Sequence, residues 1–203
     1  MNRAIFLDRD GVINKLLDGE PPESYVTRWE QLEFLPGVMD AFRLIKDTDF
    51  VPIVISNQSG IGRGWAKWFD VEDIFENMAW EICDKANVFP EYYFCPHVPE
   101  DNCACRKPSP GMIYKAAIEH EIDLSRSWMV GDSDCDIWAG KNAGIENLIK
   151  VIDKDRFDEL DKPTDSYVAL TAPEMYCYFA PDLLTATEFF VPNIPTNKEA
   201  VRC

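Results

Sequence analysis

Short apolar segments alternate with amphipathic segments along most of this chain, and no other feature restricts its fold as strongly. Helical periodicity predicts helices over 38–46, 70–86, 110–120 and 134–142, each between two apolar segments of strand length. Alternating strands and helices are typical of a parallel sheet with helices on both faces. The sequence therefore predicts a three-layer, doubly wound α/β fold. Its strands are expected at 4–8, 51–56, 92–94, 128–130 and 147–152.

The alternating pattern weakens beyond residue 153. We expect a loop over the acidic segment 153–165, one more strand at 167–170 and a terminal helix over 182–190. This C-terminal extension, 153–203, is expected to add to the sheet edge or to form a contact between subunits. The sequence has no internal repeat and no long insertion, so we expect residues 1–203 to form a single domain without a large cap.

The charge of the chain limits the partners that it can have. Its 203 residues carry a formal net charge of −16, which argues against a nucleic-acid backbone or an anionic membrane as the main partner. No segment has the length and hydrophobicity of a membrane span, and the N-terminus lacks a signal-peptide pattern. We therefore expect a cytoplasmic protein, either a monomer or a weak homo-oligomer.

The first predicted strand leads directly into two carboxylates. Asp8 ends the apolar segment, and Asp10 and Gly11 follow it. Residues i and i+2 of an extended chain point in the same direction, so both carboxylates are expected to face one small volume. Two anions held this close are unfavourable unless a cation lies beside them. The segment therefore predicts a metal site.

Further polar groups follow the other predicted strands. Ser56–Ser59 follows the second strand, Gly131–Asp136 ends the fourth, and Arg106 and Lys107 lie between the third and fourth. Ligands of doubly wound sheets bind beyond the carboxyl ends of the strands, where these groups would meet. Each group alone has an ordinary explanation, such as a turn or a helix cap. Together they suit Mg²⁺ and phosphoryl transfer through an aspartyl-phosphate.

These motifs resemble those of the haloacid dehalogenase (HAD) superfamily, in order along the chain. The resemblance rests on Asp8-x-Asp10-Gly-Val, Ser56-Asn57, Lys107 and Gly131-Asp132-x3-Asp136. A narrower similarity, to the heptose bisphosphate 7-phosphatase branch of that superfamily, covers about residues 4–152. It rests on Phe6-Leu-Asp-Arg-Asp-Gly-Val-Ile-Asn14, Phe34-Leu-Pro-Gly-Val38, Asn57-Gln-Ser-Gly-Ile-Gly-Arg-Gly64 and Cys105-Arg-Lys-Pro-Ser-Pro-Gly-Met112.

The resemblance implies a role for each matching residue. Asp8 would be the nucleophile, and Asp10 would protonate the leaving group and then activate water. Asp8, the backbone carbonyl of Asp10 and Asp132 would hold Mg²⁺, while Asp136 would orient these ligands or Lys107. The transferred phosphoryl group would be held by Ser56, Asn57 and Lys107. The substrate would also contact Gln58, Ser59, Arg63 and Arg106, with Arg106 beside its second phosphate.

A second cluster combines three cysteines and a histidine within eleven residues. Cys95, His97, Cys103 and Cys105 match the ligands of a tetrahedral zinc site. The alternative is a few buried thiols beside a surface histidine, and the resemblance favours zinc. All four ligand positions would be filled, so this zinc would be structural. The zinc loop, 95–105, would then aim the Arg106–Lys107 segment that follows it.

Three functions fit these features. The first is removal of the 7-phosphate from D-glycero-D-manno-heptose 1,7-bisphosphate, a small phosphorylated metabolite. Histidinol-phosphate phosphatase is an alternative with the same motifs. A zinc-stabilised binding protein with a vestigial site is the third, and the intact Asp8, Lys107 and Asp132 argue against it. A phosphatase for nucleic-acid ends is disfavoured by the negative charge.

Overall fold

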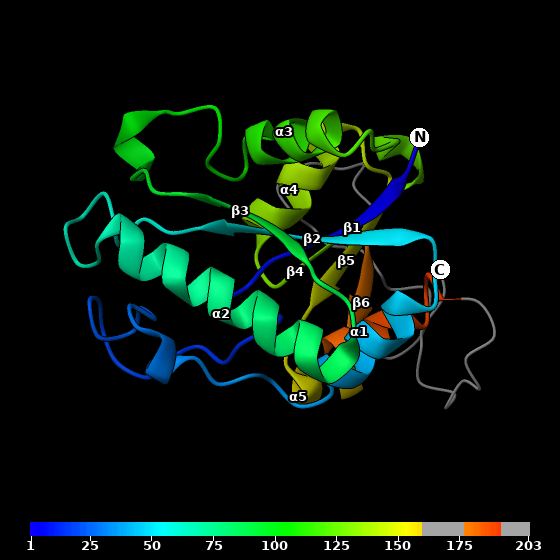
Figure 1. The fold of residues 1–203 in the computed structure, drawn as a ribbon, viewed down its shortest axis with the longest axis horizontal. Coiled ribbons are helices and arrows are strands. Elements are labelled where there is room, and N and C mark those ends of the chain that lie inside the picture. The colour runs from blue at the N-terminus through cyan, green and yellow to red at the C-terminus, as the bar shows by residue number, and fades with distance from the viewer. Residues whose placement is uncertain (160–176, 192–203) are drawn as a thin grey trace.

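The computed structural model describes residues 1–159 and 177–191, and it confirms the predicted fold. The described residues form one parallel sheet of six strands with helices on both faces (Figure 1). The strand order is β3-β2-β1-β4-β5-β6. The strands are β1 (Arg3–Leu7), β2 (Phe50–Asn57), β3 (Glu91–Cys95), β4 (Trp128–Gly131), β5 (Asn147–Val151) and β6 (Tyr178–Ala180).

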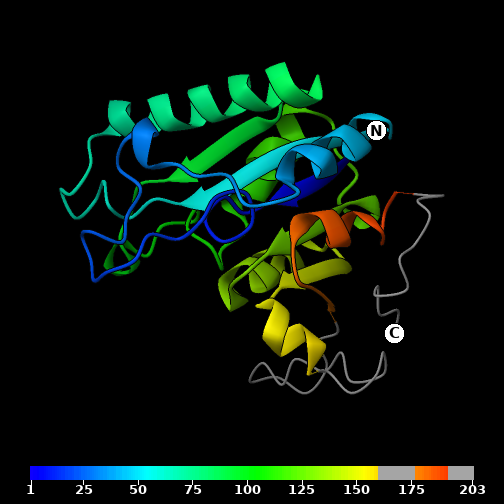
Figure 2. The ribbon, with the colours of Figure 1, turned by 90° about the horizontal axis from the view of Figure 1, so that it is seen from below.

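The helices lie in two layers, as the two views at right angles show (Figures 1 and 2). One face of the sheet is covered by α1 (Val38–Lys46), α2 (Trp68–Ala86) and α6 (Leu183–Thr187), and the other by α3 (Gly111–Glu119) and α4 (Asp134–Ala143). A short helix, α5 (Lys154–Asp158), follows β5. Single 3-10 turns occur at Trp29–Gln31, Pro99–Asp101 and Leu124–Arg126.

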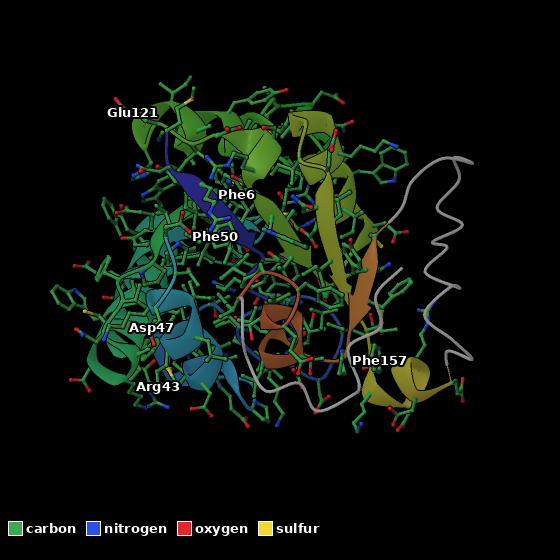
Figure 3. The ribbon with its side chains drawn as sticks, turned by 90° about the vertical axis from the view of Figure 1, so that its right-hand side faces the viewer. Phe6, Arg43, Asp47, Phe50, Glu121 and Phe157 are labelled. Atoms are coloured by element: carbon green, nitrogen blue, oxygen red, sulfur yellow. The ribbon has the colours of Figure 1, made fainter. Side chains whose placement is uncertain are left out.

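Each face of the sheet has its own hydrophobic core because side chains alternate along a strand. In β1, Ile5 and Leu7 pack into the cluster under α1 and α2, while Ala4 and Phe6 pack into the cluster under α3 and α4. Phe6 of β1 and Phe50 at the start of β2, both labelled in Figure 3, belong to the cores on opposite faces. Burial on both faces explains why the strands read as continuous apolar runs.

The strand order places a crevice at the carboxyl end of β1. The chain moves from β1 outward to β3 and then returns to the other side of β1 as β4. Such a reversal is where ligands bind in open α/β sheets. A hydrogen bond of 2.9 Å from the Asp8 N–H to the Val130 carbonyl joins β1 and β4 at this point. The motifs after β1 and β4 therefore meet.

The loop between β1 and α1 contains one 3-10 turn and no inserted domain, as expected for a fold without a large cap. No helix in the described ranges combines the length and the hydropathy that crossing a bilayer requires.

The structure corrects the predicted elements in three places. Helix α2 begins at Trp68, two residues early, because the Trp68 ring packs against Phe94 with a centroid separation of 4.7 Å. The predicted loop 153–165 is wrong over α5, where burial of Phe157 in the core orders one helical turn. Strand β6 was not predicted, and it extends the edge of the sheet. The predicted strand 167–170 lies outside the described residues.

Candidate active site and metal centre

Lys107 is the buried cation at the centre of the site. Its Nζ lies 2.7 Å from Asp8 Oδ1 and 2.6 Å from Asp136 Oδ1, and it donates a hydrogen bond of 2.7 Å to the Ile55 carbonyl. Burial by itself would lower the pKa of Lys107, but Asp136 and Asp8 outweigh burial and raise the pKa above its ordinary value. Lys107 therefore remains an ammonium ion that joins the ends of three segments.

Three carboxylates surround this single ammonium. Oxygens of Asp8, Asp132 and Asp136 lie within 4.8 Å of one another. Burial, followed by the charge of Asp136, raises the pKa of Asp8 to about 8 and that of Asp132 to about 6. The shifts show an excess of negative charge that Lys107 does not balance. Oxygen donors with an unbalanced negative charge fit a hard divalent cation.

The donors of this cluster are not equivalent. Asp136 already binds Lys107 through Oδ1, and its Oδ2 accepts hydrogen bonds of 3.0 and 2.5 Å from the Ser133 N–H and hydroxyl. Asp8 and Asp132 therefore keep oxygens that could bind a metal, while both oxygens of Asp136 have partners. The roles that the resemblance gives these residues stay predictions.

Gly11 allows Asp132 to approach the loop after β1. A Cβ atom on Gly11 would lie 2.1 Å from Asp132 Oδ2, and Gly11 has a φ of 82°. Both the close approach and the left-handed backbone exclude a larger residue without rearrangement. The glycine of the Asp-x-Asp-Gly motif therefore shapes the proposed metal site directly.

Asp10 is held by three side chains that donate to its carboxylate. Oδ1 accepts from Arg9 Nη2 at 2.8 Å and from Asn14 Nδ2 at 3.0 Å, and Oδ2 accepts from Gln58 Nε2 at 2.9 Å. Burial alone would raise the pKa of Asp10, but the Arg9 charge and these hydrogen bonds lower it below its ordinary value. Arg9 and Asn14 had no predicted role. Only their place beside Asp10 in the motif could have pointed to them.

The loop after β2 connects Asp10 with the predicted phosphoryl-binding residues. The Gln58 amide nitrogen lies 2.8 Å from Ser56 Oγ as well as beside Asp10. Asn57 forms two reciprocal hydrogen bonds of 3.0 Å with the N–H and carbonyl of Lys107. Asn57 thus fixes the main chain of Lys107, and Gln58 links Ser56 to Asp10. Their direct contacts with a substrate stay predictions.

The remaining predicted binding residues lie farther from the carboxylates. The Ser59 hydroxyl is 3.1 Å from the hydroxyl of Tyr25. Arg63 is exposed and lies over the Trp65 ring, and Arg106 donates to the His97 carbonyl at 3.2 Å. In the described part of the chain, neither arginine forms an ion pair with Asp8, Asp10, Asp132 or Asp136. A role of either one in binding a second phosphate stays a prediction.

A cavity of about 370 Å³ opens beside Asp10. Its apolar wall comes from the loop after β1, and its polar wall comes from the loop after β2. The cavity is lined by Arg9, Asp10, Leu16, Leu17, Ser24, Tyr25, Val26, Asn57 and Gln58. The space adjoins the carboxylate of Asp10, so it can receive the part of a substrate that leaves the reacting phosphoryl group.

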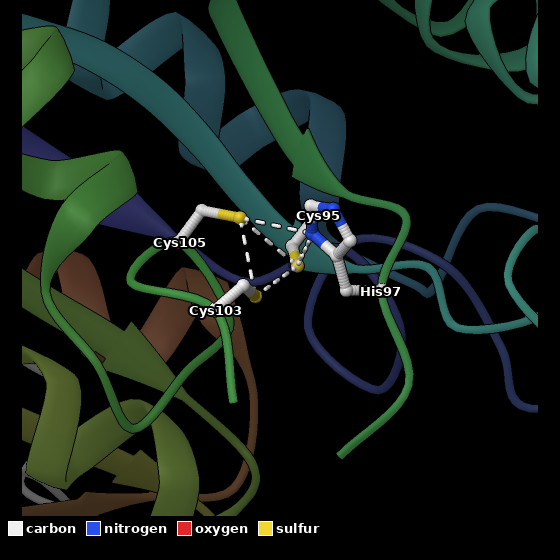
Figure 4. Close-up of side chains that lie close together, drawn as sticks. All are labelled: Cys95, His97, Cys103 and Cys105. Carbon is white, nitrogen blue, oxygen red and sulfur yellow. Dashed lines mark hydrogen bonds between the residues drawn. The ribbon is translucent and has the colours of Figure 1, made fainter. Parts of the chain in front are cut away.

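The predicted zinc ligands converge at one point (Figure 4). The three sulfur atoms lie 3.3 to 3.6 Å apart, and His97 Nδ1 lies 3.4 Å from Cys95 Sγ and 3.3 Å from Cys105 Sγ. A tetrahedron with Zn–S bonds of about 2.3 Å has edges of roughly 3.8 Å, close to these separations. The sulfurs are too far apart for disulfides, so the four donors fit one metal ion.

Backbone hydrogen bonds and short chain segments connect this cysteine–histidine cluster with the active site. Cys95 is the last residue of β3, and its carbonyl accepts a hydrogen bond of 2.7 Å from the Gln58 N–H. Lys107 follows Cys105 by two residues. The other end of the loop is held where the Gly111 N–H donates to the Ala104 carbonyl at 3.0 Å. A Cβ on Gly111 would lie 2.3 Å from that carbonyl oxygen.

Comparisons with known proteins point to one group of phosphatases. A HAD-hydrolase-like family model matches residues 104–169. The D-glycero-beta-D-manno-heptose-1,7-bisphosphate 7-phosphatase of Helicobacter pylori (strain J99) is 42% identical over 147 residues, which are 72% of this chain and 81% of that protein. The protein of the same name from Pasteurella multocida is 36% identical over 174 residues, 83% of this chain and 91% of its own length.

Solved structures give the same result. The D,D-heptose 1,7-bisphosphate phosphatase from B. bronchiseptica, crystallised with magnesium and phosphate, has a TM-score of 0.74 and is 29% identical to this chain. The match covers 92% of this chain and 97% of that chain. A D,D-heptose 1,7-bisphosphate phosphatase from Burkholderia thailandensis, with a TM-score of 0.63 and 23% identity, covers 94% of this chain and 99% of its own length and supports the fold.

Proposed function

Because this chain belongs to the HAD-like phosphatase family that includes the heptose bisphosphate 7-phosphatases, we propose that it removes the 7-phosphate of D-glycero-D-manno-heptose 1,7-bisphosphate. The observation that carries this proposal is the convergence of Asp8, Lys107 and Asp132 at one strand end, in a chain 36–42% identical to proteins of that name. These relatives disfavour the histidinol-phosphate alternative.

In the proposed reaction, Asp8 attacks phosphorus and forms an aspartyl-phosphate. The bond from phosphorus to the sugar oxygen breaks, and Asp10 gives that oxygen a proton. Water then attacks the same phosphorus, Asp10 accepts a proton from the water, and the bond to Asp8 breaks. Phosphate and the dephosphorylated sugar are the products. Lys107 and Ser56 stabilise the charge on the phosphoryl oxygens through the reaction.

The proposed metal is Mg²⁺, held by Asp8, Asp132 and the backbone carbonyl of Asp10. The excess negative charge of the site supports a divalent cation, and the B. bronchiseptica enzyme was crystallised with magnesium. When bound, Mg²⁺ would neutralise charge on the phosphoryl group. The raised pKa of Asp8 supports this assignment, because the nucleophile needs a nearby cation to remain ionised at neutral pH.

The sugar is proposed to occupy the cavity of about 370 Å³ beside Asp10. Asp10 has to reach the leaving oxygen, so the leaving group has to lie on the Asp10 side of the phosphoryl site. The cavity meets this requirement, and Gln58 lies at its boundary with Ser56. The loop after β1 supplies its apolar wall and would therefore contribute to substrate choice.

We propose that the Cys95, His97, Cys103 and Cys105 cluster binds one structural zinc ion. The proximity of three sulfurs and one imidazole nitrogen supports this assignment. Four protein ligands leave no open position, which is typical of structural zinc. The cytoplasmic location, the absence of nucleic-acid and membrane partners, and a monomeric or weakly oligomeric state stay predictions.

A phosphate-release panel in the presence of Mg²⁺ tests the proposed function. The panel should compare the α and β anomers of the heptose bisphosphate, histidinol phosphate and other small phosphomonoesters. We expect the heptose bisphosphate to have the highest kcat/KM. Asp8→Asn should lose turnover while keeping its circular dichroism spectrum. A preference for histidinol phosphate would overturn the substrate, and normal turnover by a folded Asp8→Asn protein would overturn the nucleophile.

A further inference from the structure

Arg9 is a buried arginine for which the sequence motifs suggest no role. It lies between Asp8 and Asp10 in the chain, and only 1% of its surface is exposed. A buried charge is unfavourable unless it is paired. Arg9 donates to Asp10 Oδ1 twice, from Nε at 3.2 Å and from Nη2 at 2.8 Å. The guanidinium group thus forms two hydrogen bonds to Oδ1 of Asp10, the proposed acid–base residue.

An aromatic ring of the hydrophobic core also contacts the Arg9 guanidinium group. Its central carbon lies 4.9 Å from the centre of the Phe75 ring. Phe75 is fully buried in α2 and stacks on Phe94 and Tyr92 of β3, with centroid separations of 5.2 and 5.5 Å. A planar guanidinium can bind a carboxylate through the N–H groups at its edge while its face lies over a ring. The hydrophobic core therefore fixes where Arg9 places Asp10.

The two oxygens of Asp10 have different partners. Arg9 and Asn14 bind Oδ1, on the side of the buried turn. Among the residues that the structure describes, Oδ2 accepts from Gln58 alone, and the same Gln58 nitrogen lies 2.8 Å from Ser56 Oγ. Oδ2 is thus the oxygen directed toward the phosphoryl-binding residues. One oxygen is anchored to the core, and the other is left for proton transfer.

We propose that Arg9 is a positioning residue that anchors Asp10 Oδ1 so that Oδ2 is presented to the leaving oxygen of the substrate. This inference rests on the proposed function, in which Asp10 moves the proton. In this role Arg9 acts through Asp10, whose Oδ1 it binds, and not on the reacting atoms. It acts in both steps, because Asp10 gives a proton to the leaving oxygen in the first and accepts one from water in the second.

The side chain can be tested separately from the backbone turn. The Arg9 carbonyl accepts hydrogen bonds from the N–H groups of Val12, Ile13 and Asn14, and a substitution keeps these bonds. Arg9→Met retains a flexible apolar stem against Phe75 but has no donor for Asp10. Arg3→Met is a matched control: Arg3 also binds an aspartate, Asp49, and lies over a ring, Phe50, but at the opposite end of β1.

The experiment uses two leaving groups. An alkoxide, as from the heptose bisphosphate, needs a proton to leave, whereas p-nitrophenolate leaves without one. For Arg9→Met we expect kcat on the heptose bisphosphate to fall on the order of 100-fold. The p-nitrophenol burst, which reports aspartyl-phosphate formation, should keep its rate within about threefold and be followed by slow steady-state turnover. Burst amplitude counts folded sites, so partial misfolding does not affect the comparison.

The outcomes separate positioning from a structural role. Equal slowing of aspartyl-phosphate formation with both leaving groups, or no slowing of that step with either, would overturn the inference, and Arg3→Met should match the wild type with both. Asp10→Asn distinguishes the inference from the proposed function. If Asp10→Asn loses alkyl-phosphate turnover and Arg9→Met does not, only the positioning role of Arg9 fails. If Asp10→Asn turns over the heptose bisphosphate normally, the acid–base role of Asp10 fails.

Discussion

Two buried cationic side chains, Lys107 and Arg9, form ion pairs with different carboxylates of the active site. Lys107 pairs with Asp8 and Asp136, and Arg9 pairs with Asp10. The compact ammonium of Lys107 binds two carboxylates, whereas the planar guanidinium of Arg9 donates two hydrogen bonds to a single carboxylate. This pairing leaves Asp132 without a cationic partner among the described residues, at the position where a metal ligand is expected.

Removing the ammonium should destabilise the protein strongly. Lys107→Met leaves Asp8 and Asp136 buried without their cation, and breaking a buried pair in this way costs about 3 kcal/mol or more. Urea denaturation without Mg²⁺ measures the free energy of unfolding. Lys85→Met is the control, because its ion pair with Glu81 is exposed and should contribute about 1 kcal/mol or less. Equal effects of the two substitutions would contradict the structural role of Lys107.

Mg²⁺ should bind more tightly as the pH rises from about 6 to about 8. The pKa of Asp8 is raised to about 8 and that of Asp132 to about 6, so the metal-free site is protonated in this range. A metal binds the carboxylate form and has to displace each proton, which makes affinity change by roughly tenfold per pH unit for each proton displaced. Titration calorimetry at pH 6, 7 and 8 measures this dependence.

The Asp8→Asn protein supplies the control for that titration. It lacks the group whose pKa lies near 8, so its Mg²⁺ affinity should be weaker and almost constant above pH 7. A wild-type affinity that does not change between pH 6 and pH 8 would show that the carboxylates are already ionised in the metal-free protein.

Sequence patterns located the residues that directly follow strands, and missed those whose partners depend on packing. Asp8 and Asp132 lie at strand ends, so the parallel sheet predicts that they meet. The contacts of Arg9 and Asn14 with Asp10 follow from a tight turn packed under α2, which no local pattern encodes. The partners of Arg63 and Arg106 were harder still to predict, because Arg63 is exposed and Arg106 is held by the zinc loop through the His97 carbonyl.

Individual elements were predicted well where periodicity and turn signals agree. The bounds of α1 match the prediction, and Gly37 supplies the left-handed residue that precedes the helix. Helix α5 and strand β6 were missed because each is short and is ordered by contacts with the rest of the fold. Phe157 packs into one core cluster, and β6 pairs with β5. Short elements of this kind carry too few residues to show a period.

The loop 95–105 should depend on zinc for its structure. It has little apolar material of its own, and metal binding can supply on the order of 10 kcal/mol toward ordering it. We expect about one zinc ion per chain, and Cys103→Ser should lower the melting temperature and the phosphatase activity even with excess Mg²⁺. Cys83→Ser, outside the cluster, is the control. Metal analysis that finds no zinc in freshly purified protein would contradict the prediction.

At the scale of the whole molecule, the active site joins three neighbouring strand ends with Lys107, which comes from the segment after β3. Asp8 and Asp10 follow β1, Ser56 lies in β2, and Asp132 follows β4. The strand order puts β1 between β2 and β4, so the three strand ends become neighbours although they are far apart along the chain. The fold class predicted this convergence. Which side chains then touch each other depends on loop lengths and packing, which the fold class leaves open.

The same convergence has a consequence for the order of events during synthesis. The proposed nucleophile Asp8 is made before its partner Lys107, which follows 99 residues later, and Asp136 follows later still. The central strand β1 cannot pair with its neighbour β4 until residues 128–131 have been synthesised. Pairings so distant in sequence form slowly. Until Lys107 and β4 have been synthesised, Asp8 therefore lacks both its ion-pair partner and one of the strands beside it.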